Sequence, residues 1–129
     1  MMIWLAIALG GAVGALTRYG VSQAVMMTNG TTFAPIATVM VNVIGSGIMG
    51  VCYGYLSAGG VMAESVRMFI MVGFLGALTT FSTFSMDIMV SIDRGQMIGA
   101  MIYTMVSVAG SVLIFILAAQ MMRALYGAG

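Results

Sequence analysis

The chain has 129 residues, of which 62% are hydrophobic and 5% are charged, and its mean hydropathy is +1.16. Soluble domains carry about 25% charged residues, so this composition excludes a soluble globular protein and indicates an integral membrane protein. A single cysteine, Cys52, and the lack of histidine exclude an internal disulfide and speak against a zinc or haem site.

Four apolar segments are each long enough to cross a bilayer, which takes about 20 mostly apolar residues. In chain order they are about Ile3–Met27, Pro35–Leu56, Val66–Ile92 and Met97–Tyr126. Short polar connections separate them, at Thr28–Ala34, Ser57–Ser65 and Asp93–Gly95. We therefore expect an all-α membrane protein with a single transmembrane domain over residues 1–129 and both termini on one side of the membrane.

The first span carries two glycines four residues apart, Gly10 and Gly14, and one charged residue, Arg18. Small residues at this spacing let membrane helices approach closely. A charge at the bilayer centre costs at least ~2.5–3.5 kcal/mol on insertion scales, so Arg18 needs a partner or water. It is either an anion attractor at a vestibule or a structural anchor bonded to carbonyls at a helix end.

The second span begins at Pro35, a residue that suits the first turn of a helix. Asn42 and Ser46 lie one turn apart in it, followed by the close-packing glycines Gly50 and Gly54. An amide has two donor hydrogens, so Asn42 either binds a substrate or hydrogen-bonds a neighbouring helix.

The third span contains the sequence GALTTFSTF at residues 76–84, which places hydroxyl groups deep in an apolar segment. Glycine and threonine are weak helix formers, and such hydroxyls compete for backbone hydrogen bonds. We expect a helix break near Gly76–Thr80, where freed carbonyls line a cavity or hold a cation; the alternative is a kinked helix. Asp87 follows one turn later and is expected to be a helix-end acid paired with an arginine, although a proton or cation role stays open.

The fourth span places Tyr103, Ser107 and Ser111 four residues apart. Side chains at this spacing share one helix face. Three aligned hydroxyl groups favour a wet or substrate-facing stripe over isolated hydroxyls bonded to their own helix.

The arginines are balanced between the two ends of the predicted bundle. Arg67 and Arg123 lie toward the end that carries the termini, and Arg94 and Arg18 toward the other. The positive-inside rule then favours neither orientation. Because four short spans are few to enclose a pore, we expect an antiparallel dimer with its pathway between subunits, formed by two copies of this chain or by this chain and a paralogue.

The segments GGAVGALTRY (Gly10–Tyr19), NVIGSGIMG (Asn42–Gly50) and GFLGALTTFSTFSMD (Gly73–Asp87) together resemble the Fluc family of fluoride channels, also called CrcB-like proteins. The resemblance covers all four spans in order and length. It implies passive fluoride export that protects the cell from fluoride toxicity, by an antiparallel, dual-topology homodimer with two pores. It also implies the bacterial inner membrane, with lipid as the surroundings and no nucleic-acid partner.

The resemblance assigns roles to residues at the matching positions. Backbone carbonyls of Gly76 and Thr79 would hold a structural Na⁺ at the dimer two-fold axis, and Arg18 would be the vestibule arginine. The fluoride pore would be lined by Phe81, Phe84, Asn42, Ser82, Thr83, Tyr103, Ser107 and Ser111. Two departures from the family pattern are Ala77, where glycine is common, and Asp87, where glutamate is commoner.

The main alternative function is a small dual-topology multidrug or cation exporter, which fits the size, span number and charge balance equally well. Such an exporter needs a carboxylate within the first span, and this chain has none there. A non-transporting accessory subunit would leave the TTFSTF motif and the polar stripe without a purpose. We do not expect an enzyme, because the sequence holds no nucleophile–base pair.

Overall fold

The computed structural model describes residues 1–29 and 34–127, and all regular structure in these residues is helical. The helices are α1 (Met2–Asn29), α2 (Ala34–Ser57), α3 (Glu64–Arg67), the π-helical segment η2 (Met68–Phe74), α4 (Leu75–Leu78), α5 (Ser82–Asp93) and α6 (Met97–Tyr126). They form four segments that are long and apolar enough to span a membrane: Met2–Thr28, Pro35–Ser57, Glu64–Asp93 and Met97–Tyr126. The expected all-α class and the four apolar segments are thereby confirmed. The polar turn predicted at Thr28–Ala34 lies mostly outside the described residues.

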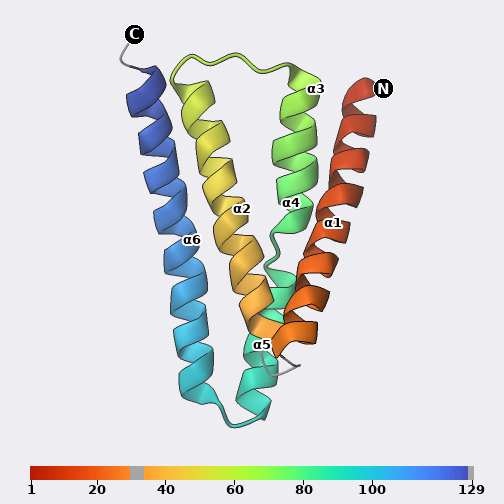
Figure 1. Ribbon diagram of the computed structural model, residues 1–129, viewed down its shortest axis with the longest axis vertical. Coiled ribbons are helices and arrows are strands. Elements are labelled where there is room, and N and C mark those ends of the chain that lie inside the picture. Colours follow the sequence, from red (N-terminus) through yellow and green to blue (C-terminus); the bar gives the residue numbers. More distant parts are fainter. Residues whose placement is uncertain (30–33, 128–129) are drawn as a thin grey trace.

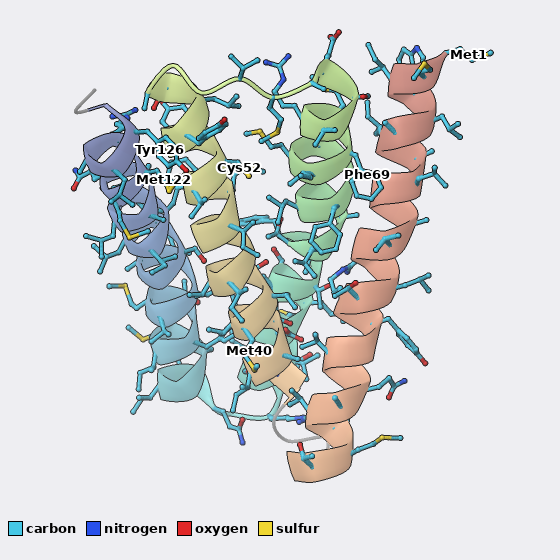
Figure 2. All side chains as sticks on the ribbon, turned by 45° about the horizontal axis from the view of Figure 1, so that its top comes forward. Met1, Met40, Cys52, Phe69, Met122 and Tyr126 are labelled. Atoms are coloured by element: carbon cyan, nitrogen blue, oxygen red, sulfur yellow. The ribbon has the colours of Figure 1, made fainter. Side chains whose placement is uncertain are left out.

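The four segments run side by side, and the two ends of the chain lie at the same end of the bundle (Figure 1). The connection from α2 to α3 lies at that end too, and the turn from α5 to α6 lies at the opposite end (Figure 1). In Figure 2, Met1 and Tyr126 mark the shared end on the two outermost helices. The arrangement agrees with the up-down order expected from four spans.

Glycines allow two pairs of helical segments to approach closely. Between α1 and the third segment, a Cβ atom at Gly10 would lie 2.3 Å from the carbonyl oxygen of Phe69, which Figure 2 shows beside α1. Between α2 and α6, a Cβ atom at Gly50 would lie 2.4 Å from the carbonyl oxygen of Phe115. No side chain larger than hydrogen fits at these distances, so the predicted small-residue contacts are confirmed.

The third segment is interrupted between α4 and α5. Thr79 has φ −78° and ψ 150°, which is an extended conformation, and the helix resumes at Ser82. A small buried core of Val41, Leu75 and Leu78 lies beside the interruption and fixes the end of α4 against α2. The interruption at residues 79–81 overlaps the end of the predicted break at Gly76–Thr80, but Gly76 and Ala77 still belong to α4.

Candidate functional site

The interruption is held from the side by α2. The Nδ2 group of Asn42 donates a hydrogen bond to the carbonyl of Thr80 at 3.1 Å, and the amide of Thr80 donates to Oδ1 of Asn42 at 2.8 Å. One side-chain amide therefore satisfies both backbone polar groups of a residue that has left the helix. Of the two roles that the sequence left open for Asn42, the structure contains the hydrogen bond to a neighbouring helix.

A second helix, α1, holds the interruption from the other direction. Nε of Arg18 donates to the carbonyl of Ala77 at 3.1 Å, and Nη1 donates to Oγ1 of Thr83 at 3.4 Å. Ala77 lies in the last turn of α4, where carbonyls lose their helical partners. Arg18 is thus bonded as a structural anchor at a helix end, one of its two predicted roles.

The Thr80 hydroxyl bonds the first turn of α5, whose N-cap residue Phe81 makes no side-chain cap bond. Oγ1 of Thr80 accepts the backbone amide hydrogen of Thr83 at 3.2 Å and donates to Oγ1 of Thr83 at the same distance. Oγ of Ser82 lies 3.2 Å from Oγ1 of Thr80. A threonine that accepts a free amide of the first turn stabilises a helix N-terminus, so these hydroxyls allow the helix to restart inside an apolar segment.

A cavity of about 460 Å³ opens beside the interruption. It brings together α2, the interrupted segment and one face of α6. The lining residues are Asn42, Ser46, Gly76, Thr79, Thr80, Phe81, Phe84, Ser107, Val108, Ser111 and Val112. This list contains five of the eight residues predicted to line a pore, and both residues predicted to bind a cation. It contains no charged side chain.

The cavity combines aromatic rings with neutral hydrogen-bonding groups. The rings of Phe81 and Phe84 face it with their centroids 5.4 Å apart. Ser107 and Ser111, two of the three residues of the stripe on α6, line the cavity. Oγ of Ser111 is buried and has no hydrogen-bond partner within the described residues, so its hydroxyl donor is unused in the single chain.

Three residues predicted to line the pore lie outside this cavity. Ser82 and Thr83 lie in the first turn of α5, where their hydroxyls contact the hydroxyl of Thr80. The hydroxyl of Tyr103 donates to Oδ2 of Asp87 at 3.0 Å, and its ring lies 5.3 Å from that of Phe84, centroid to centroid. Tyr103 therefore packs against Phe84, which lines the cavity, but does not line the cavity itself.

Asp87 differs from the expectation that it pairs with an arginine. Its buried carboxylate accepts hydrogen bonds from the hydroxyls of Thr38, at 2.7 Å, and Tyr103. The prediction was wrong because the tertiary fold brings two hydroxyl donors to this carboxylate, one from α2 and one from α6. A buried carboxylate needs donors, and hydroxyls supply them as arginine would.

Three residues of this region were not among the predicted site residues. Thr80 and Ser46 line the cavity, and Thr38 binds Asp87. A usable signal existed, because Thr38, Asn42 and Ser46 are four residues apart and form a polar stripe on α2. That stripe faces the stripe on α6, and α2 packs more extensively against α6 than against any other helix.

No group of three or more histidine, cysteine or acidic side chains that could hold a metal occurs in residues 1–29 and 34–127. Backbone carbonyls at the interruption are the remaining candidates for cation ligands. The amide of Thr80, which in a continuous helix would bond the carbonyl of Gly76, bonds Asn42 instead. The amide of Thr83 likewise bonds Thr80 Oγ1 rather than the carbonyl of Thr79, so both carbonyls are released from the helical pattern.

A helical membrane protein with an interrupted span and an uncharged polar cavity belongs to the class of transporters and channels, in which irregular backbone occurs where it lines a cavity. The model of the CrcB-like protein, Camphor Resistance (CrcB) family matches residues 5–119, and the chain belongs to this family.

Three relatives are similar over most of their length. Each carries the name fluoride-specific ion channel FluC. The protein of Aeromonas salmonicida is 42% identical over 102 residues, which is 79% of this chain and 81% of the relative. The protein of Sphingopyxis alaskensis is 44% identical over 104 residues, 81% of this chain and 82% of the relative. The protein of Photobacterium profundum is 44% identical over 116 residues, 90% of this chain and 91% of the relative.

Proposed function

We propose that this chain forms a fluoride-selective ion channel, through which fluoride leaves the cell passively and is kept below toxic levels. The relatives named above are ion channels, not enzymes, and they are named for fluoride. The cavity carries the proposal: it joins two phenylalanine rings, an asparagine amide and serine hydroxyls, without any charged side chain.

The cavity suits the chemistry of a small, strongly hydrated anion. Fluoride must exchange its water donors for protein donors that do not retain it, and conduction requires binding that is weak enough to release the ion. Hydroxyls of Ser107 and Ser111 and the amide of Asn42 are neutral donors of this kind. Ring edges carry the positive side of the aromatic quadrupole, so Phe81 and Phe84 would contact the anion edge-on.

The functional unit is an antiparallel homodimer with two pores. On a single chain Phe81 is 75% exposed and Gly76 is also exposed, although both line the cavity. Gly76 has a released carbonyl, and such a group cannot face lipid, because hydrocarbon offers no hydrogen bond. A second subunit against this face would cover it, and the balanced arginines let that subunit insert in the opposite orientation.

A Na⁺ ion would sit where the interrupted segments of two subunits meet. The carbonyls of Gly76 and Thr79 fit this role, because their usual amide partners bond Asn42 and the Thr80 hydroxyl. Carbonyl oxygens are ligands that hard cations accept. The ion would supply a fixed positive charge that ties the subunits together and lowers the cost of holding anions nearby.

In bacteria the protein belongs in the inner membrane, surrounded by lipid. Efflux from liposomes tests the function directly: with valinomycin relieving charge build-up in potassium fluoride-loaded liposomes, fluoride leaves rapidly and chloride does not. Equal efflux of both ions, or an absolute need for a proton gradient, would refute a passive fluoride channel. The latter would favour the exporter, whose required carboxylate α1 lacks.

A further inference from the structure

We infer that Asn42 acts as a positioning residue that keeps the third segment unwound, in addition to any contact with a passing ion. Its side-chain amide occupies both backbone polar groups of Thr80, at 3.1 and 2.8 Å. The inference deepens the proposed function and rests on it only for its consequence for conduction. The hydrogen bonds themselves are present whatever the channel carries.

The double hydrogen bond is incompatible with a helical Thr80. In a helix the N–H and C=O of one residue point in opposite directions along the axis, whereas in extended backbone they point to the same side. A single planar amide can bond both groups of one residue only in the second case. Asn42 therefore selects the extended form of Thr80, next to the extended backbone of Thr79.

Occupying the Thr80 amide has a consequence one turn earlier. If that amide returned to the helix, it would bond the carbonyl of Gly76, and α4 would continue toward Phe81. Asn42 prevents this by providing a competing acceptor. The carbonyl of Gly76, a residue that lines the cavity, stays free of its helical partner because that partner, the Thr80 amide, is bonded to Asn42.

The same geometry orients what remains of the Asn42 amide. One Nδ2 hydrogen is used by the carbonyl of Thr80, and the amide has a second one. Because the amide is planar and both its bonds to Thr80 use one edge, this second hydrogen points away from Thr80. Asn42 lines the cavity. The two bonds to Thr80 therefore fix the side-chain rotamer of Asn42 and, with it, the direction of its remaining N–H donor.

The test measures amide hydrogen exchange at Thr80 by NMR in the assembled protein in nanodiscs. In the described residues no backbone carbonyl accepts the amide of Phe81, so in the unchanged protein Thr80 should exchange roughly five- to tenfold more slowly than Phe81, the net effect of one hydrogen bond. Asn42→Leu, which keeps the side-chain shape and removes both bonds, should abolish this difference. Asn42→Asp keeps an acceptor for the Thr80 amide, and should preserve it.

Ser46→Ala is the matched control, since Ser46 lines the same cavity one turn along α2. It should leave the exchange of Thr80 unchanged. Unchanged Thr80 exchange in assembled Asn42→Leu, or equal exchange at Thr80 and Phe81 in the unchanged protein, would overturn the inference. If Asn42→Leu does not assemble, loss of the slow Thr80 exchange in assembled Asn42→Asp would likewise overturn the inference, and its preservation would support it. A protein that shows the expected exchange and conducts no fluoride would refute the proposed function and leave the positioning role intact.

Discussion

The rings of Phe81 and Phe84 are neighbours, with centroids 5.4 Å apart and planes inclined by 45°, yet their surroundings differ sharply. Phe84 is 5% exposed and also touches Tyr103, whereas Phe81 is 75% exposed on the single chain. The two rings therefore have separable roles. Phe84 is buried within the subunit, whereas the surroundings of Phe81 in the assembled channel come from contacts outside the single chain.

Substitution of each phenylalanine by isoleucine should separate conduction from stability. We expect both Phe81→Ile and Phe84→Ile to reduce fluoride flux severely, because an aliphatic side chain lacks a positive ring edge. Only Phe84→Ile should also lower the free energy of unfolding of the solubilised protein, by about 1–2 kcal/mol, because a buried aromatic ring is replaced by a smaller side chain. Fluoride flux per correctly assembled protein and the unfolding midpoint are the measurements. Normal flux in assembled Phe81→Ile would contradict the pore role.

Lysine at position 18 tests what Arg18 does. Arg18→Lys keeps the charge, but a single ammonium cannot reproduce the pair of bonds from Nε to Ala77 and from Nη1 to Thr83. We expect a loss of about 1.5–3 kcal/mol in stability, the range for hydrogen bonds to charged groups, together with reduced flux. Arg94→Lys, in the exposed turn before α6, is the control and should change neither property. Full stability and flux in Arg18→Lys would support a pure anion-attracting role.

The carboxylate of Asp87 should depend on both of its hydroxyl donors. Tyr103→Phe keeps the ring beside Phe84 and removes one donor. We expect it to destabilise the protein by about 1–3 kcal/mol, because a buried acceptor loses a partner. In Asp87→Asn the same change should cost less, and a double-mutant cycle measures the difference. A coupling energy near zero would show that the Tyr103–Asp87 bond contributes nothing.

A structural Na⁺ between the interrupted segments, as proposed above, predicts that removal of sodium impairs the assembled protein. Removing it exhaustively, with N-methyl-D-glucamine as the replacement cation, should lower the stability of the dimer and its flux, since the released carbonyls of Gly76 and Thr79 would face each other without a cation. Recovery on adding sodium back, but not magnesium, would indicate a monovalent site. Full conduction after exhaustive removal, with no density between the two interrupted segments in a high-resolution map, would count against the ion.

Charge added at one end of the bundle should fix the orientation of the chain. Ala63→Lys with Ala124→Lys places two positive charges at the end that carries the termini, where both alanines are exposed. By the positive-inside rule this variant should insert in one orientation and lose activity when expressed alone. Gln96→Lys with Met97→Lys biases the opposite end, and co-expression of the two variants should restore flux. An unchanged protein whose N-terminus is accessible from only one side would refute dual topology.

The sequence was sufficient to predict the membrane class, the four apolar segments and a helix interruption that includes Thr79 and Thr80. These are local properties, since spans follow from the length and hydropathy of a segment. The interruption follows from glycine and hydroxyl residues at 76–83, which weaken a helix wherever it packs. The small-residue contacts at Gly10 and Gly50 were also visible, because their spacing has a meaning only on a helix face.

Only the tertiary structure decided which groups hold the interruption. Asn42 and Thr80 are 38 residues apart in the chain, and Arg18 and Ala77 are 59 apart, so no local pattern pairs them. The partner of Asp87 was misjudged for the same reason, since a carboxylate in hydrocarbon requires donors, but the packing of α2 and α6 determines that these are hydroxyls. Most buried polar groups in a folded protein have a hydrogen-bond partner, but which side chain serves as that partner depends on which helices become neighbours.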